Sequence, residues 1–212
     1  MLWHASSIND ILTILLMRLP IAAFSLGTHE FAHAYAAYKL GDPTAKNLGR
    51  VTLNPLVHLD FIGTLAMLFA PIGWPKPTPL NPANFRNRKR DSALVAAAGP
   101  LSNFLLSLTA LIIIKILFHF PQTPEIVCQF FEVFAFMNLG LCLFNLIPIP
   151  PFDGGEIFMP YFPVGFRKLF SENGKYSLLV LIVIIYFISD FISMAVYFLL
   201  GKMIFLLNFL PF

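Results

Sequence analysis

The sequence predicts an all-α polytopic membrane protein with four spanning helices, one or two re-entrant or half segments, and a short β element near the cytosolic face. Three observations lead to this fold class. Charged residues make up only 12% of the chain, whereas about a quarter of an ordinary soluble domain is charged. Hydrophobic residues make up 58%, and the mean hydropathy is +0.76. Several apolar runs reach the length of about twenty residues that a helix needs to cross a bilayer.

No polar stretch is long enough to bury a core of its own, so residues 1–212 are predicted to form one integral-membrane domain. Its first helix is predicted at residues 8–40, and Pro20 is expected to kink that helix. The sequence Gly41-Asp42-Pro43 is expected to end it, because a helix does not continue through such a turn.

Near its end this helix reads H-E-x-x-H, from His29 to His33. Positions four residues apart lie one turn apart on the same face of a helix. The imidazoles of His29 and His33 can therefore bind one zinc ion, and Glu30 can act as general base on a water beside that ion. An ionisable cluster in an apolar helix is costly, which makes it a functional candidate.

Residues 42–91 are predicted to form a cytosolic region with a re-entrant part. A short strand is expected from Asn47 to Leu53, where apolar and polar residues alternate. The apolar piece at 61–74 is too short to span and is interrupted by proline and glycine, so it is interpreted as re-entrant or interfacial. The basic cluster from Arg86 to Arg90 indicates the cytosolic side, because cytosolic loops of membrane proteins are enriched in Lys and Arg.

Three more spanning helices follow, and they are predicted at residues 92–118, 125–147 and 176–200. The loop at 148–176 is expected on the cytosolic side, which places the N-terminus outside. Gly201-Lys202 is expected to break the last helix, so that residues 203–212 form a half segment.

A catalytic zinc usually has three protein ligands, so one ligand is still required beside the two histidines. His58 lies beyond a proline-containing loop and is a poor candidate. Asp153 is the better one, because it follows the cytosolic end of the helix at 125–147 and precedes two glycines that allow close backbone approach. The histidine helix also ends on the cytosolic side, so both elements are expected at one depth.

Three stretches resemble the signature regions of the site-2 protease family of intramembrane zinc metalloproteases: H-E-F-A-H at 29–33, A-G-P-L-S-N at 98–103 and N-L-I-P-I-P-P-F-D-G-G at 145–155. The resemblance implies that His29, His33 and Asp153 bind zinc and that Glu30 is the catalytic base. It implies substrate or oxyanion contacts for Asn145 and Asn103, and a membrane-dipped strand or loop within 47–74. Phe152 stands where the family usually has Leu; both are apolar, so little consequence is expected.

The function expected from these residues is that of a zinc-dependent intramembrane endopeptidase with one zinc per chain, which cleaves a membrane protein in regulated intramembrane proteolysis. The resemblance is closest to short prokaryotic members without an appended regulatory domain, which implies a multi-pass protein of the cell (inner) membrane. Expected partners are the lipid bilayer and a membrane-embedded protein substrate; a homo-oligomer or a regulatory membrane partner is left open. The net charge of +3 is too small to argue for nucleic acid.

Two other functions are weighed against this one. A zinc-binding transporter or channel would also use polar residues within membrane helices, but it has no special need for a base such as Glu30 beside its first ligand. A catalytically silent relative that binds membrane proteins is the third hypothesis. The complete set of ligands and base argues against it.

Overall fold

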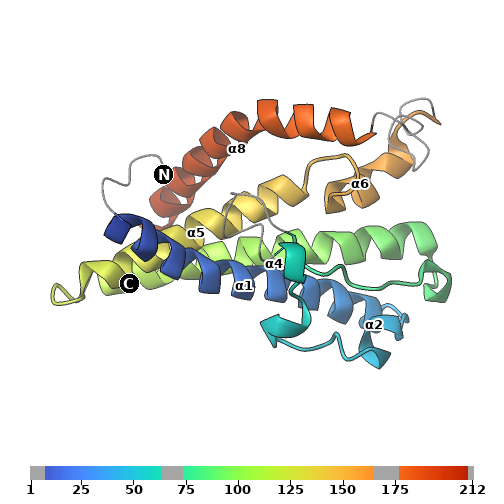
Figure 1. The fold of residues 1–212 in the computed structure, drawn as a ribbon, viewed down its shortest axis with the longest axis horizontal. Coiled ribbons are helices and arrows are strands. Elements are labelled where there is room, and N and C mark those ends of the chain that lie inside the picture. Colours follow the sequence, from blue (N-terminus) through green and yellow to red (C-terminus); the bar gives the residue numbers. More distant parts are fainter. Residues whose placement is uncertain (1–7, 64–73, 165–176, 210–212) are drawn as a thin grey trace.

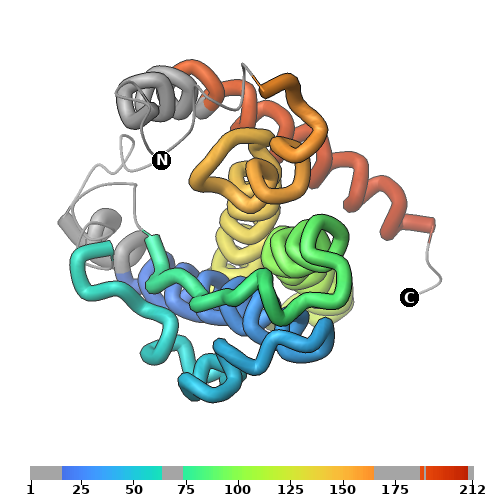
Figure 2. Tube along the Cα trace, turned by 90° about the vertical axis from the view of Figure 1, so that its right-hand side faces the viewer, coloured from blue at the N-terminus to red at the C-terminus, as the bar shows by residue number. Residues whose placement is uncertain are grey.

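The computed structural model describes residues 8–63, 74–164 and 177–209. Its helices are α1 (Ile8–Lys39), α2 (Thr44–Asn47), η2 (Pro55–Val57), η3 (Pro82–Asn84), α4 (Arg88–Leu117), α5 (Glu125–Asn145), α6 (Asp153–Phe158), η4 (Met159–Tyr161) and α8 (Ser177–Leu207). Figure 1 shows α1, α4 and α5 along the long axis of the molecule, with α8 on one side and α2 on the other. Figure 2, viewed along that axis, shows α4 beside both α1 and α5. The fold is thus a helical bundle around α4.

One face of α4 forms the centre of this bundle. Its buried residues recur every three to four positions and are mostly small or aliphatic: Val95, Ala96, Gly99, Pro100, Asn103, Ser107, Ala110, Leu111 and Ile114. Small side chains let helix backbones approach closely, which is how helices pack in membranes. The Ser107 hydroxyl donates to the Ala135 carbonyl of α5 at 2.9 Å, so a polar group in the core is satisfied across the helix pair.

The boundaries of the first three long helices agree with the sequence prediction within a few residues. α1 ends at Lys39, and Gly41 follows it with a φ of 106°, in the left-handed region that glycine adopts readily. α4 begins four residues before the predicted start at residue 92, because Asn87 caps it by accepting a hydrogen bond from the Arg90 backbone N–H at 3.1 Å. α5 ends at Asn145, two residues before the predicted end.

Two predictions about the last third of the chain are wrong. Gly201 and Lys202 do not break the helix, since α8 continues to Leu207. A single glycine costs a helix only about 1 kcal/mol, whereas a break within lipid leaves backbone groups without hydrogen-bond partners. The region 148–176 is not loop throughout, because Asp153–Phe158 forms α6 and Met159–Tyr161 forms η4.

The strand predicted from Asn47 to Leu53 is also wrong. These residues form the end of α2, a turn at Gly49 and two bends, and Arg50 N–H donates to the Ala45 carbonyl at 2.9 Å. Local hydrogen bonds therefore satisfy this backbone, and no partner strand is needed. In the described part of the chain, β pairing is confined to an isolated antiparallel bridge between Leu59 and Pro75. Most of the predicted re-entrant piece at 61–74 lies outside the described residues.

Among the described residues, three helices are long and apolar enough to cross a membrane: α4, α5 and the part of α8 from Asp190 to Leu207. These helices identify an integral membrane protein. Helix α1 is not among the three, so the predicted count of four spans stays a prediction.

Two buried charged residues hold the loops that follow α1. Asp42 is fully buried and accepts hydrogen bonds from the Asn81 backbone N–H at 2.7 Å, the Asn84 amide at 2.7 Å and both donors of Thr44. Burial by itself raises the pKa of the Asp42 carboxyl, but these hydrogen bonds outweigh it and hold the pKa below its ordinary value of 3.8. The chain after α1 is thereby tied to the segment before α4.

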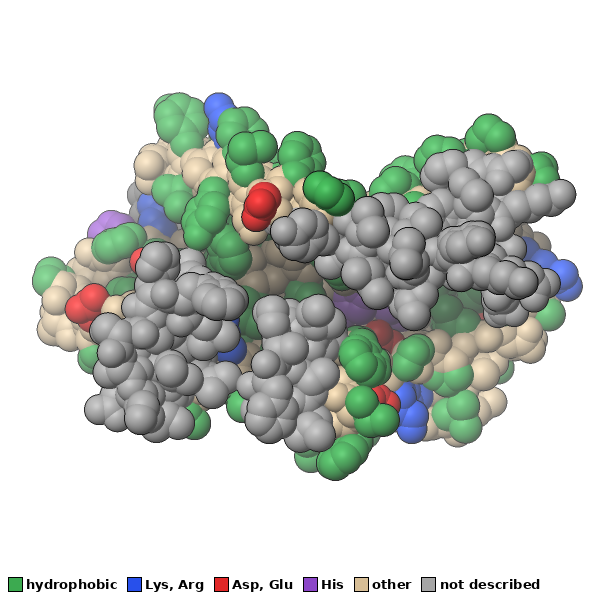
Figure 3. Space-filling view, turned by 45° about the horizontal axis from the view of Figure 1, so that its top comes forward, with side chains coloured by type: hydrophobic (Ala, Val, Ile, Leu, Met, Phe, Trp, Pro, Cys, Tyr) green, Lys and Arg blue, Asp and Glu red, His purple; other side chains and the backbone are tan. Residues whose placement is uncertain are grey.

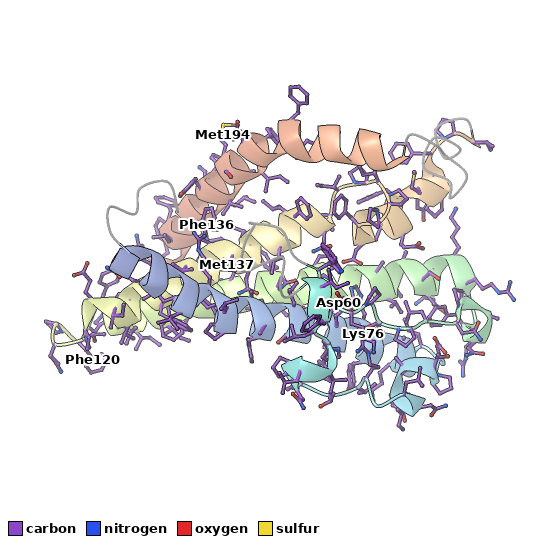
Figure 4. All side chains as sticks on the ribbon, viewed as in Figure 1. Asp60, Lys76, Phe120, Phe136, Met137 and Met194 are labelled. Carbon is purple, nitrogen blue, oxygen red and sulfur yellow. The ribbon has the colours of Figure 1, made fainter. Side chains whose placement is uncertain are left out.

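Arg50 makes the second tie. Its guanidinium donates to the carbonyls of Val57, Lys76 and Pro77. It therefore joins the chain on both sides of the Leu59–Pro75 bridge, next to which the Lys76 N–H donates to the His58 carbonyl at 2.7 Å. Asp60 and Lys76, labelled in Figure 4, each follow one of the two bridge residues directly in the sequence.

Candidate active site

The H-E-x-x-H turn of α1 directs both histidines to one point. His29 and His33 are 4% and 6% exposed, and their Nε2 atoms lie 3.0 Å apart. The imidazole planes are nearly perpendicular, so the rings meet at their nitrogens rather than stacking. Histidine and acidic side-chain surface lies together in a recess near the middle of the face drawn in Figure 3.

Asp153, the first residue of α6, completes this cluster. Its Oδ2 lies 3.1 Å from His29 Nε2, and its Oδ1 lies 3.3 Å from His33 Nε2. Two glycines let α6 fold back against the end of α5. A Cβ on Gly154 would overlap the carbonyl oxygens of Leu146 and Ile147, and a Cβ on Gly155 would lie 2.7 Å from the Pro150 nitrogen.

A chain of hydrogen bonds fixes the tautomer of His29. Asn138 of α5 donates its amide to the Phe134 carbonyl at 2.9 Å, and a carbonyl can only accept. Asn138 Oδ1 therefore faces Asn103 Nδ2 at 3.0 Å, which turns Asn103 Oδ1 toward His29 Nδ1 at 2.6 Å. The Nδ1 of His29 must then carry a proton, so in the neutral ring its Nε2 presents a lone pair to the cluster.

His33 has the same tautomer for a simpler reason. Its Nδ1 lies 2.8 Å from the Val95 carbonyl oxygen of α4, which accepts only. In the neutral ring its Nε2 therefore also presents a lone pair. Histidines that bind metals usually donate their second nitrogen in this manner to a carbonyl or another acceptor, which fixes the ring.

With both rings neutral, the cluster thus brings together two nitrogen lone pairs and a carboxylate. Asp153 Oδ2 is buried and lacks a hydrogen-bond donor among the described residues. A cation satisfies all three groups at once. Ligands of one tetrahedral zinc at about 2.1 Å lie about 3.4 Å from one another, and the observed separations of 3.0–3.3 Å are close to that value. His29, His33 and Asp153 therefore fit a metal ion.

Gly99 makes the approach of α4 to this cluster possible. A Cβ at this position would lie 2.6 Å from Nε2 and from Cε1 of His29, and closer still to Nε2 of His33. Real Cβ atoms essentially never approach that closely, so Gly99 forms part of the wall of the site.

Glu30 is 5% exposed and follows the first histidine directly. Among the described residues, Thr78 is the hydrogen-bond donor to its carboxylate, with 2.7 Å between Thr78 Oγ1 and Glu30 Oε2. Thr78 belongs to the extended segment between Trp74 and Leu80, far from α1 in the sequence. Sequence reasoning missed it, because a threonine in a proline-rich run is typical of an ordinary loop.

The two asparagines that were predicted to contact substrate lie in different surroundings. Asn103 is fully buried, and its amide is engaged by His29, Asn138 and, at 3.4 Å, the Ser25 carbonyl. Asn145 is half-buried at the end of α5, and its amide donates to the Leu141 carbonyl at 3.0 Å. Of the two residues, Asn145 is the one that is partly exposed in this arrangement.

Comparisons with known proteins agree with this geometry. A sequence model described as Peptidase family M50 matches residues 19–189. The chain is 39% identical over 170 residues to "Putative zinc metalloprotease YwhC" of Bacillus subtilis, a match that covers 77% of this chain and 76% of that protein. It is 29% identical over 165 residues to "Putative zinc metalloprotease Rip2" of Mycobacterium tuberculosis, covering 76% and 62%, and 24% identical over 166 residues to Rip2 of Mycolicibacterium smegmatis, covering 76% and 63%. No solved structure matches the chain.

Proposed function

Because the chain belongs to peptidase family M50, the site-2 protease family of zinc metalloproteases, we propose that His29, His33 and Asp153 are its zinc ligands and that Glu30 is the general base of peptide-bond hydrolysis. The protein is a zinc-dependent intramembrane endopeptidase that acts on membrane-protein substrates. The transporter or channel hypothesis gains no support from the family or from the relatives.

One observation carries the assignment of the ligands. The two imidazole nitrogens and the carboxylate converge at 3.0–3.3 Å. With neutral rings all three groups present lone pairs, because Asn103 and the Val95 carbonyl hold the ring protons at Nδ1. Such an arrangement is unfavourable without a cation between the groups. Zinc, when bound there, would activate water and polarise the scissile carbonyl.

Other steps of the reaction are assigned to side chains of the protein. Glu30 accepts the proton of the attacking water and delivers it to the amine that leaves. Asn103 orients His29 and Val95 orients His33, and we assign Asn103 to that role in place of the oxyanion contact first expected. Asn145, the last residue of α5, remains the candidate for hydrogen bonding to the substrate carbonyl. The burial of Glu30 and both histidines keeps bulk water from competing for these hydrogen bonds.

We also propose how the enzyme sits in the membrane. α1, α4, α5 and α8 cross the cell (inner) membrane of a prokaryote, so that the protein is multi-pass and its active site lies near the cytosolic face. Support comes from the basic cluster at Arg86 to Arg90, which leads into the first turn of α4 and marks one side of the bilayer. Reporter fusions at residues 88 and 122 are expected to report opposite sides; the same side for both would refute this topology. We further propose that the protein associates in the membrane, either with a second copy of itself or with a regulatory membrane protein. Crosslinking in native membranes tests this association.

Zinc content and cleavage, measured together on detergent-purified protein, test the assignment of the site. Wild type is expected to hold one zinc and to cut single-span membrane peptides. Glu30→Gln is expected to keep zinc and to lose cleavage, because the amide cannot take a proton, and Asp153→Asn is expected to lower zinc affinity. Unchanged cleavage by Glu30→Gln would contradict the role of Glu30 as base, and full zinc occupancy in Asp153→Asn would contradict the role of Asp153 as ligand.

A further inference from the structure

The carboxylate of Glu30 is held by a residue outside the three sequence signatures. Thr78 Oγ1 lies 2.7 Å from Glu30 Oε2 and 3.1 Å from the Glu30 backbone oxygen. We propose that Thr78 is a positioning residue for the reaction: its hydroxyl donates to one oxygen of Glu30 and so aims the other at the water to be deprotonated. This inference rests on the proposed role of Glu30 as general base.

The direction of this hydrogen bond follows from the chemistry of the two side chains. A carboxylate only accepts, and a threonine hydroxyl has one proton to donate. The distance to the side-chain Oε2 is the shorter of the two, so the hydroxyl proton is assigned to that oxygen. A glutamate has three rotatable side-chain bonds, so an unheld Glu30 would leave its working geometry often. The hydroxyl of Thr78 restricts those rotations without occupying Oε1.

Thr78 can perform this task only if its own position is fixed, and the structure fixes it from both sides. Arg50 donates to the carbonyls of Lys76 and Pro77, just before it. Asp42 accepts from the Asn81 N–H at 2.7 Å, three residues after it. Pro77 and Pro79 flank it directly, and each proline fixes its own φ.

These ties connect the base to the loops around the bundle. The segment that carries Thr78 is anchored through Arg50 and Asp42, both of which are buried and belong to the chain that follows α1. The Leu59–Pro75 bridge closes the same segment at its start. Helix α1 supplies Glu30, and the loops that follow it supply the frame that orients Glu30.

A simpler role for Thr78 is attachment of its segment to α1 through the Glu30 backbone oxygen. The two roles differ in what they predict for kinetics. A positioning residue changes the rate of the chemical step, kcat, and leaves zinc and substrate binding intact. An attachment residue changes the melting temperature or KM, and kcat follows only as far as the folded fraction falls.

The test compares Thr78→Val, which keeps the shape and removes the donor, with Thr78→Ser, which keeps the donor. Both are assayed in detergent micelles with a fluorogenic single-span peptide, together with zinc content and thermal unfolding. Thr78→Val is expected to lower kcat about tenfold to a hundredfold, since small misplacements of reacting groups cost that much. Its KM should stay within about twofold, with one zinc bound, and Thr78→Ser should restore kcat to within about threefold of wild type.

Thr109→Val is the matched control, because Thr109 is exposed on α4 and, among the described residues, its hydroxyl bonds along its own helix, to the Leu105 carbonyl at 2.8 Å. It should behave as wild type. The proposal is overturned by wild-type kcat in Thr78→Val, by Thr78→Ser as slow as Thr78→Val, or by a loss of kcat that parallels a loss of zinc. Thr78→Ala provides the same comparison if the valine variant does not fold. Full cleavage activity in Glu30→Gln would instead contradict the proposed role of Glu30 as general base, so failure of that role can be distinguished from failure of the role of Thr78.

Discussion

Replacing Gly99 by alanine adds a single methyl group, and the structure shows where it would go. The new Cβ would lie 2.6 Å from Nε2 and Cε1 of His29, about 0.8 Å inside the 3.4 Å at which ordinary contact begins, and it would press harder still on His33. Neither ring can simply turn away, because Asn103 and the Val95 carbonyl hold them from the same helix. The methyl group must therefore push α4 from α1 or displace both imidazoles.

The magnitude follows from this geometry. Extra volume in a close-packed region costs about 1–3 kcal/mol, and in Gly99→Ala that strain falls on the two rings that present lone pairs to the metal. Disturbing the groups that orient metal ligands lowers affinity about tenfold to a hundredfold. We expect Gly99→Ala to lose zinc affinity by that factor and kcat by at least as much, while the helical content stays at the wild-type level.

The assay is a competition between the protein and a fluorescent zinc chelator in detergent, with circular dichroism and cleavage measured on the same samples. Gly140→Ala is the matched control, since Gly140 lies on α5 and its Cβ would meet no described residue within 4 Å. Alanine there should be neutral or slightly stabilising. Wild-type zinc affinity and cleavage in Gly99→Ala would refute the argument that this glycine makes room for the histidines.

Three further changes test other parts of the structure. Asn138→Leu should lower zinc affinity about tenfold although Asn138 contacts no proposed ligand, because the Asn103 amide that fixes the tautomer of His29 is then free to turn. The same chelator competition measures this affinity. Asp42→Asn should lower the free energy of unfolding at pH 7 by about 1–3 kcal/mol, measured by denaturant titration in detergent. The pKa of Asp42 in the folded protein lies below its ordinary value of 3.8. The stability that ionised Asp42 contributes is therefore fully present above pH 3.8 and is lost as the pH falls through the folded pKa. The difference in free energy of unfolding between wild type and Asp42→Asn should accordingly shrink below about pH 4. Arg50→Lys should lower kcat in the same manner as removal of the Thr78 hydroxyl, because one ammonium cannot reach all three carbonyls. Equal kcat for Arg50→Lys and wild type would contradict the proposal that Arg50 holds the Thr78 segment in place beside Glu30.

Much of the fold could be predicted because a long apolar run in a membrane can form few structures other than a spanning helix, and its interruptions mark where that helix ends. The ends of α1 and α5 were predicted to within a few residues from Gly41 and from the prolines that follow residue 147. The start of α4 was predicted four residues late, because the Asn87 cap was not recognised. The same reasoning failed at Gly201, where a residue that often ends helices in water does not end one in lipid. It also failed at residues 47–53, where a few alternating residues were too short a pattern to distinguish a strand from turns.

The candidate site could be predicted only as far as side-chain types reveal it. His29, Glu30, His33 and Asp153 carry chemistry that few other residues supply, and loop charges were enough to place them at one depth. The groups that orient them carry weaker signals. His33 is held by the backbone carbonyl of Val95, which any residue could provide, and Glu30 by a threonine, which is common in loops. Roles of this kind depend on three-dimensional contacts that no sequence pattern records.

The contacts between α1 and α4 explain why these two helices must pack in one register. His29 meets Asn103, and His33 meets Val95, so the order along one helix is reversed along the other and the pair is antiparallel. Val95, Gly99 and Asn103 are spaced by four residues, as His29 and His33 are, and such positions line one face of a helix. Gly99 therefore lies midway between the two orienting contacts, directly against both imidazoles. A shift of α4 by a single residue would rotate all three away from the histidines, so the same packing that buries α4 also sets the tautomer and direction of both proposed ligands.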